Sequence, residues 1–282
     1  MDLSIIITVF NSENILEKLI NRIYESSNAK DFPKKFEVIL INDFSHDGSW
    51  KKIKSLSSEF GNIKGINLNK NYGQHNAIMA GLNECVGDII ITMDDDLQHP
   101  PESIKDIYNE LNKNFDVCYV YYLKRKHILW KKVVSRLNNL IASYLLNKPI
   151  KIYMSSFRGF KKEIVQKIIQ HQESRVYLDA LILKTTKNIS MISVPHHKRL
   201  YGDGNYSFKK LISLWSDMVI NFFIYPIRFA TFYGLIIKYL IIIYRKIFLK
   251  NKQNRNQYLI KEKTISMPSA INQPPRTQRR DK

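Results

Sequence analysis

Short runs rich in apolar residues alternate with longer amphipathic stretches over the first third of the chain. The apolar runs cover 3–9, 36–41, 63–68 and 87–93. The stretches between them have the apolar spacing of helices, at 12–27, 47–60 and 73–84. A strand that is apolar at every position is buried on both faces, as in a parallel sheet covered by helices. The pattern therefore predicts βαβ units and an α/β fold with a mostly parallel central sheet.

The pattern is less regular beyond residue 100. We expect a helix after Pro100-Pro101 and a basic helix around 130–146, with strands at 115–122 and near 189–194. Residues 251–282 are polar and show no periodicity, which predicts disorder. The expected organisation is an α/β domain over 1–205, apolar helices over 206–249 and a basic disordered tail over 250–282.

The segment between the α/β domain and the tail has the character of a membrane-associated region. Residues 208–223 are aromatic and amphipathic, as in a helix that lies at a bilayer surface. Residues 227–244 are marginal as a membrane span, because a span needs ~20 apolar residues and Lys238 interrupts this one. A buried core helix is the alternative, but the α/β domain is complete before this segment. We expect membrane association without two full spans.

The charge of the chain points to an anionic partner. The 282 residues include 44 Lys and Arg against 25 Asp and Glu, a net charge of +19. Residues 245–282 hold eleven basic and two acidic residues. Because this excess follows an apolar segment, it favours an anionic membrane surface, with no role for nucleic acid.

The cysteines and the N-terminus indicate a cytoplasmic location for the α/β domain. Cys85 and Cys118 stand alone, without the spacing of a metal site, and are typical of reduced cysteines in a cytosolic protein. The opening residues, MDLSIIITVF, lack the basic start of a signal peptide and are interpreted as a first strand.

Polar and acidic side chains follow three of the predicted strands. They are Thr8, Phe10 and Asn11 after the first, Asp43 and Asp47 after the second, and Asp94, Asp95 and Asp96 after the run at 87–93. Ligands bind beyond the carboxyl ends of the strands in an open parallel sheet, so we expect these side chains to share one edge. Turn formation alone accounts for Asp47-Gly48, but a turn does not need three adjacent carboxylates.

Two carboxylates held two residues apart after a strand suit a hard divalent cation. Mg²⁺ or Mn²⁺ takes oxygen ligands from one or two carboxylates and completes its shell with phosphate and water oxygens. Asp94 and Asp96, with Gln98 nearby, are the expected metal ligands, and a nucleotide diphosphate is the expected second partner.

The residues around these aspartates resemble a known family. MDDDLQHPPE resembles the D-x-D motif of family 2 glycosyltransferases with the GT-A fold, in the branch of dolichyl-phosphate mannose synthase, which loads sugars onto polyprenyl phosphates. ITVFNSENI, VILINDFSHDGS and NKNYGQHNAIMAGL resemble the family's donor-binding elements, and HHKRLYGDGNYSFKKLISLW resembles its acceptor-side loop. The resemblance covers residues 3–235, and several motifs in the right order make it specific.

The resemblance implies a role for individual residues on the donor side. Asp43 is expected to hold the uracil side of the nucleotide, with Asn42 in place of the usual preceding aspartate. Thr8 stands where a proline is common, and Lys70 replaces an arginine beside the donor. The expected donor-binding set is Thr8, Phe10, Asn11, Asp43, Lys70, Asp94 and Asp95.

An inverting transfer to a polyprenyl phosphate is the implied reaction. The acceptor oxygen is already ionised, so it needs cations to hold it more than a base. Arg136, Arg199 and Tyr206 are the expected acceptor contacts, with Lys124 or Arg125 as further candidates. Arg199 is favoured because it lies in the acceptor-side loop, although for each basic residue a solvated surface role is an equal alternative.

Two other functions are left open by the sequence. In one, a hydroxyl acceptor of a cell-surface polysaccharide receives the sugar and Asp179 acts as the base; a helix residue that caps or pairs locally is the alternative for Asp179. For transfer to a polyprenyl phosphate, Asp96 and Arg199 are the expected catalytic residues. In the other, the chain is a non-catalytic, membrane-bound binder of nucleotide sugars. The adjacent His196 and His197 are assigned to loop structure or acceptor contact, since adjacent side chains of a strand point apart. The enzyme is expected at the cytoplasmic face of the cytoplasmic or inner membrane, and a homo-oligomer is a further expectation.

Overall fold

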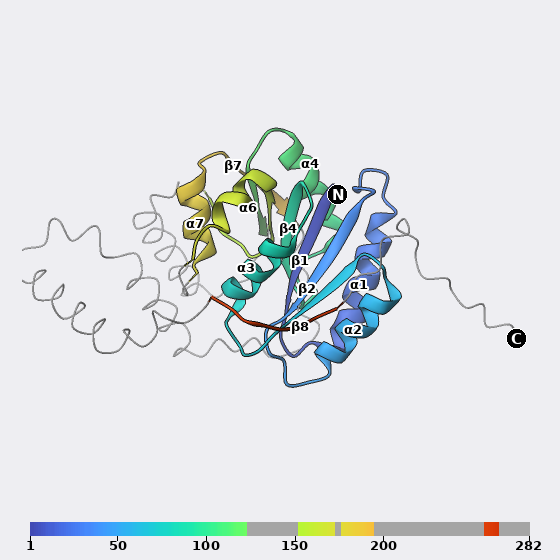
Figure 1. The fold of residues 1–282 in the computed structure, drawn as a ribbon. Coiled ribbons are helices and arrows are strands. Elements are labelled where there is room, and N and C mark those ends of the chain that lie inside the picture. Colours follow the sequence, from blue (N-terminus) through green and yellow to red (C-terminus); the bar gives the residue numbers. More distant parts are fainter. Residues whose placement is uncertain (123–151, 173–175, 195–256, 265–282) are drawn as a thin grey trace, which may run out of the picture.

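The computed structural model describes residues 1–122, 152–172, 176–194 and 257–264, shown in colour in Figure 1. The strands are β1 (Leu3–Val9), β2 (Phe36–Asn42), β3 (Ile63–Leu68), β4 (Ile89–Asp94), β5 (Val117–Tyr122), β6 (Arg158–Lys161), β7 (Ile189–Val194) and β8 (Ile260–Lys263). The helices are α1 (Glu13–Ser27), α2 (Ser49–Glu59), α3 (Gln74–Glu84), η1 (Pro101–Ser103), α4 (Ile104–Asn112), α6 (Lys162–Ile168) and α7 (Leu178–Thr185). The strands and helices expected in these ranges are confirmed.

The described strands form one sheet in the order β7-β5-β6-β4-β1-β2-β3-β8. β1 pairs in parallel with β2 and β4, and β2 pairs in parallel with β3. β6 runs antiparallel between β4 and β5, and β8 runs antiparallel to β3. The prediction of a mostly parallel sheet is confirmed, and the two antiparallel strands were not predicted because each is only four residues long.

Helices cover both faces of the sheet, as the continuous apolar strands require. Ile5 and Ile7 of β1 pack in one core with residues of α1, α2 and α4, whereas Ile6 packs in a second core with residues of α3, α6 and α7. Figure 1 shows α1 and α2 on one side of β1 and β2, and α3, α6 and α7 on the other. Each fully buried Ile or Leu stabilises the fold by about 1.5–3 kcal/mol, so this three-layer packing holds the strand ends in place.

The expectation of a disordered tail over 250–282 is wrong for residues 257–264. Ile260–Lys263 form β8, and the Thr264 amide donates to the Gly65 carbonyl (3.0 Å) while the Gly65 amide donates to the Thr264 hydroxyl (2.7 Å). The outer edge of β3 offers unpaired backbone groups, which a polar segment can pair with because its side chains remain in solvent. The α/β domain therefore includes this segment, in addition to the residues described before 195.

Two expected features lie outside the described residues: the basic helix at 130–146 and the apolar region 206–249. No helix within the described part of the chain is both long and apolar enough to cross a bilayer.

Candidate active site

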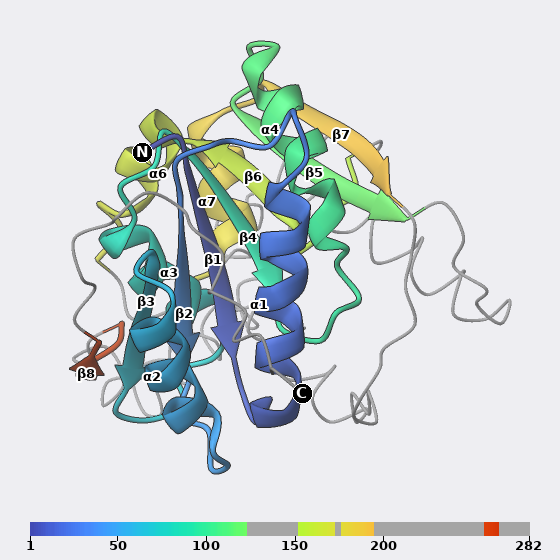
Figure 2. The same ribbon diagram turned by 90° about the vertical axis from the view of Figure 1, so that its right-hand side faces the viewer.

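The ends of β1, β2 and β4 meet at one edge of the sheet, as Figure 2 shows. Thr8 at the end of β1 pairs with Ile41 of β2 on one side and with Asp94 of β4 on the other. Asp43, directly after β2, therefore lies at the same edge as Asp94. The expectation that the polar residues after these strands share one edge is confirmed.

Each of these three strands is followed by a residue in the left-handed backbone region. Asn11 follows β1 (φ 55°), Phe44 follows β2 (φ 63°) and Leu97 follows β4 (φ 59°). A bulky residue in this conformation is strained, and such strain gathers at functional sites where the surrounding structure imposes it. The three tight turns keep the polar side chains close to the strand ends.

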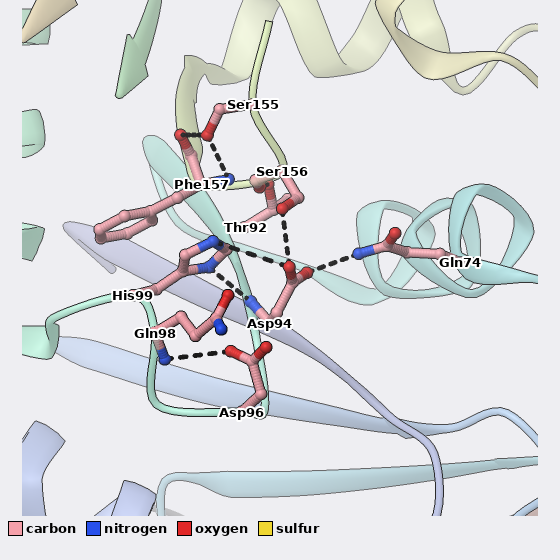
Figure 3. A network of polar contacts seen from close by, with 9 residues as sticks. All are labelled: Gln74, Thr92, Asp94, Asp96, Gln98, His99, Ser155, Ser156 and Phe157. Atoms are coloured by element: carbon pink, nitrogen blue, oxygen red, sulfur yellow. Dashed lines mark hydrogen bonds and ion pairs between the residues drawn. The ribbon is translucent and has the colours of Figure 1, made fainter. Parts of the chain in front are cut away.

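Asp94 is held by side chains from three different segments (Figure 3). Its Oδ1 accepts a hydrogen bond from Gln74 Nε2 of α3 (2.5 Å), and its Oδ2 accepts one from Ser156 Oγ (2.7 Å). The Thr92 hydroxyl donates to the Ser156 carbonyl (2.8 Å), which places Ser156 beside β4. The carboxylate orientation is thereby fixed, and Oδ1 keeps a second lone pair for a ligand.

His99 completes the support of Asp94. Its Nδ1 accepts the Asp94 amide (2.9 Å), so the ring carries its proton on Nε2, which faces Asp94 Oδ2 at 3.6 Å. The buried ring stacks on Phe157 (centroids 5.0 Å apart). One side chain thus engages both the backbone and the carboxylate of Asp94. This role of His99 was missed from the sequence, although its place in LQHPPE was a signal.

Asp95 braces the turn against the loop after β1. Its Oδ2 accepts the Phe10 amide (3.1 Å) and the Ser12 hydroxyl (2.5 Å). Burial raises the pKa of Asp95 to about 6, against the opposing effect of these two hydrogen bonds. The structure thus gives Asp95 a positioning contact, and its expected contact with the donor stays a prediction.

Asp96 lies on the following turn, where its Oδ1 accepts the Gln98 amide (3.0 Å). Within the described residues, no group of three or more His, Cys, Asp or Glu side chains is arranged as a ready metal site. Asp94 and Asp96 therefore offer an incomplete set of hard oxygen ligands, which fits a cation that a diphosphate must help to bind.

Asp43 organises the loop before α3, residues 69–73, which we call the donor loop. Its two carboxylate oxygens accept the amides of Tyr72 (2.8 Å) and Gly73 (2.9 Å). Burial raises the pKa of Asp43, and these backbone hydrogen bonds oppose the rise. Gly73 has φ 84°, a conformation that favours glycine. The ammonium of Lys70 lies 4.8 Å above the Tyr72 ring centre.

The asparagine at position 42 has a structural explanation. The Asn42 side chain donates through Nδ2 to Asn67 Oδ1 (2.8 Å) and accepts the Ser45 amide at Oδ1 (3.3 Å). Asn67 lies on β3. An aspartate at position 42 would place a carboxylate against the Asn67 side-chain oxygen, another acceptor, whereas Asn42 can donate to it. The pair fixes the turn after β2 without a buried charge.

Asp179 belongs to a buried ion pair. It pairs with Arg158 Nη1 of β6, and its Oδ1 also accepts the Tyr119 hydroxyl (2.8 Å). The Arg158 guanidinium lies 5.7 Å from the Tyr119 ring centre and 6.0 Å from that of Phe160. Burial lowers the pKa of Arg158, but Asp179, Tyr119 and Tyr177 together outweigh this effect and the pKa is raised. The local pairing expected for Asp179 is instead a long-range pairing between α7 and β6.

His75, next to Gln74 on α3, faces this ion pair. Its Nδ1 is buried with no hydrogen-bond partner among the described residues, and its ring lies edge-on to Tyr177 (5.3 Å). Burial lowers the pKa of His75 from 6.5 to about 4; Arg158 adds to this effect, while Asp179 and Asp94 oppose it. The imidazole is therefore neutral at neutral pH.

The lowered pKa of His75 gives an expected pH dependence of stability. Between pH 6.5 and about 4 the unfolded chain binds a proton at this residue and the folded protein does not, so stability falls as the pH falls. We expect His75→Gln to reduce the loss of unfolding free energy between pH 7 and pH 5 by about 1–2 kcal/mol. Urea unfolding at the two pH values measures the effect. Equal losses in wild type and variant would contradict the prediction.

Of the other expected site residues, some lie at this edge and some lie outside the described part of the chain. Phe10 lies at the edge and is half exposed. Asn11 joins the loop after β1 to the loop after β2: its side-chain oxygen accepts the His46 backbone N–H (2.8 Å), and its own backbone N–H donates to Ser45 Oγ (2.9 Å). The expected acceptor residues lie outside the described part of the chain: Lys124, Arg125, Arg136, His196, His197, Arg199 and Tyr206.

Comparison with known proteins identifies the family. The model of the family described as "Glycosyl transferase family 2" matches residues 4–169. The undecaprenyl-phosphate 4-deoxy-4-formamido-L-arabinose transferase of Proteus mirabilis is 32% identical over 235 residues, 83% of this chain and 72% of its own length. The protein of the same name from Yersinia enterocolitica is 33% identical, over 83% of this chain and 71% of its own.

Solved structures share the fold at low sequence identity. Glucosyl-3-phosphoglycerate synthase from Mycobacterium tuberculosis, in complex with Mn²⁺, uridine diphosphate and glucosyl-3-phosphoglycerate, has a TM-score of 0.53 and 14% identity over 77% of this chain and 76% of its own. TarS 1–349 of S. aureus has a TM-score of 0.51 and 18% identity over 89% and 74%. The family match, the relatives and the α/β GT-A architecture agree, and the chain belongs to glycosyltransferase family 2.

Proposed function

We propose that this glycosyltransferase moves a sugar from a nucleotide-diphosphate sugar to undecaprenyl phosphate or a related polyprenyl phosphate. We propose UDP as the nucleotide of the donor. The observation that carries the proposal is the convergence of Asp43, Asp94 and Asp96 at one sheet edge, which supports a nucleotide diphosphate with its base near Asp43 and its metal near Asp94 and Asp96. The relatives at 32–33% identity are named for transfer to undecaprenyl phosphate, which supports the acceptor.

Asp94 and Asp96 fit a divalent cation, Mg²⁺ or Mn²⁺. Both offer carboxylate oxygens, and Gln98 lies on the same turn. The Mn²⁺ and uridine diphosphate in the mycobacterial synthase, which shares the fold, support this assignment. When bound, the cation would neutralise the negative charge that develops on the leaving diphosphate.

The protein's own residues prepare the donor for attack. Asp43 keeps the donor loop in place through Tyr72 and Gly73. The carboxylate of Asp94 is fixed in turn by three side chains, those of Gln74, Ser156 and His99. Because the protein itself supplies these contacts, little reorganisation is needed when charge develops on the diphosphate. A phosphate acceptor is ionised at neutral pH, so in-line attack with inversion needs no side-chain base.

A hydroxyl acceptor with Asp179 as base is the second candidate, and the buried ion pair weighs against it. Asp179 already accepts the Tyr119 hydroxyl and is paired with Arg158, so its Oδ1 is engaged by two donors. A base must lie within reach of the proton that it removes, and Asp179 is buried.

We propose that the acceptor meets the enzyme at the cytoplasmic face of the membrane. The aromatic segment 208–223 and the basic residues of 245–282 support this location, since each ordered Lys or Arg near an anionic leaflet contributes about 1 kcal/mol. Arg199, Arg136 and Tyr206 are proposed as acceptor contacts by resemblance to the family's acceptor-side loop.

The test is transfer of label to lipid. Membranes containing the protein are incubated with undecaprenyl phosphate and a panel of radiolabelled nucleotide sugars, with 4-deoxy-4-formamido-L-arabinose included because the relatives are named for it. We expect labelled lipid with one donor, and we expect Arg199→Ala to lower labelling while UDP affinity stays unchanged. Full-rate transfer to a water-soluble hydroxyl acceptor, with none to lipid phosphate, would overturn the proposal.

A further inference from the structure

Residues 257–264, which we call the strap, run along the lateral edge of the sheet, beside β3 and away from the edge formed by the strand ends. Their strand β8 pairs with β3, as Figure 2 shows at the sheet edge. Side chains of the strap also reach the helices on both faces of the sheet. Glu262 accepts the Trp50 indole N–H of α2 (2.9 Å), and Lys263 pairs with Glu84 of α3 (2.7 Å).

Both ends of the strap are fixed by further hydrogen bonds. At its start, the Gln257 side chain donates to the His171 carbonyl, after α6. At its end, the Thr264 hydroxyl donates to Ser57 Oγ of α2 (3.2 Å). The strap is therefore a bound part of the α/β domain along its whole length.

The start of the strap contacts the donor loop directly. The Leu259 carbonyl accepts the Asn69 amide (3.0 Å). The Tyr72 hydroxyl, at the far end of the same short segment, donates to Asn69 Oδ1 (2.8 Å). Leu259 therefore holds Asn69 directly, and Asn69 links the strap to Tyr72 across the short segment that carries Lys70 and Asn71.

The same segment is bound to Asp43 from its other side. The Tyr72 amide donates to Asp43 Oδ1 (2.8 Å), and Asn71 Nδ2 donates to the Asp43 carbonyl (3.1 Å). The Tyr72 ring also carries the Lys70 ammonium (4.8 Å). The donor loop is thus held between the strap and the carboxylate that is proposed to bind the nucleotide base.

We propose that the strap positions the residues that bind the nucleotide. It fixes the position of the donor loop and, through Tyr72, the positions of Lys70 and Asp43. This inference rests on the proposed function, because it takes the ligand at Asp43 to be a nucleoside diphosphate. The chain that holds Arg199 and Tyr206, the proposed acceptor contacts, joins β7 to the strap. Donor binding therefore depends on residues that follow the proposed membrane-associated region in the sequence.

Two truncations separate the strap from the rest of the tail. One chain ends after residue 256 and lacks the strap, and the matched control ends after Thr264 and keeps it. We expect UDP, titrated with Mn²⁺ by calorimetry, to bind the shorter chain about three- to tenfold more weakly than the control, the scale of one or two lost hydrogen bonds. In transfer assays we expect a raised KM for the donor with kcat little changed. Equal UDP affinity in the two chains would overturn the inference.

Tyr72→Phe in the full chain tests the same contact without a truncation. The variant keeps the ring under Lys70 and loses the hydroxyl that donates to Asn69, the residue that the strap binds through Leu259. We expect weaker UDP binding in the full chain, and no further loss when the substitution is placed in the chain that ends after residue 256. Unchanged UDP affinity in the full chain would overturn the inference. So would an equal, additive loss in both backgrounds, because Tyr72 would then act independently of the strap.

The outcomes distinguish this inference from the proposed function. If the wild-type protein binds UDP and Asp43→Ala abolishes that binding while loss of the strap changes nothing, the donor site stands and the strap has no positioning role. If the wild-type protein binds no nucleoside diphosphate, the proposed donor site itself fails.

Discussion

Asp96→Asn is expected to abolish sugar transfer while the protein stays folded. The substitution removes a negative charge from the proposed metal site, and a metal or oxyanion contact of this kind is worth about 10²–10³ in rate or more. The fold should tolerate the substitution, because the side-chain oxygen of an asparagine can accept the hydrogen bond that the Gln98 backbone N–H donates to Asp96 Oδ1. Transfer of labelled sugar and thermal unfolding measure the two effects.

Asp88→Asn is the matched control for this experiment. Asp88 lies just before β4, at the opposite end of the strand that leads to Asp94, and its side chain makes an exposed ion pair with Lys162 (3.6 Å). The variant should transfer sugar at the wild-type rate, since exposed pairs contribute little. Turnover near the wild-type value in Asp96→Asn would remove the metal hypothesis.

The second large effect is expected on stability, from Asp179→Asn. The substitution leaves the Arg158 guanidinium buried without its counter-charge. Breaking a buried ion pair by neutralising one partner costs about 3–5 kcal/mol. The free energy of unfolding in urea, measured near neutral pH, should fall by an amount in this range.

A double substitution separates structure from catalysis at this position. Replacing Arg158 with Met and Asp179 with Leu removes both charges, and apolar replacement of a whole buried pair is often neutral or stabilising. We expect it to recover much of the stability and, with a phosphate acceptor, measurable transfer. Wild-type stability in Asp179→Asn, combined with loss of transfer to a hydroxyl acceptor, would instead support the role of Asp179 as a base.

The sequence by itself determined the central sheet and the edge at which the candidate donor site lies. The runs at 3–9, 36–41 and 87–93 are apolar at most positions, and such runs are typical of strands covered on both faces. Once the strands are parallel, their carboxyl ends share one edge, so Asp43 and Asp94 had to meet there. These features follow from local pattern and from general rules of topology.

Only the tertiary structure decided which side chains support that edge. Ser156, from the segment before β6, and Gln74 of α3 both reach Asp94, and Arg158 meets Asp179 across two segments. Such contacts depend on the order of the strands and on the antiparallel register between distant segments. The apolar periodicity of a single segment carries no information about either. The strap is the clearest case: residues 257–264 have the composition of a disordered tail, and they are ordered because the open edge of β3 offers backbone hydrogen bonds that their own sequence does not reveal.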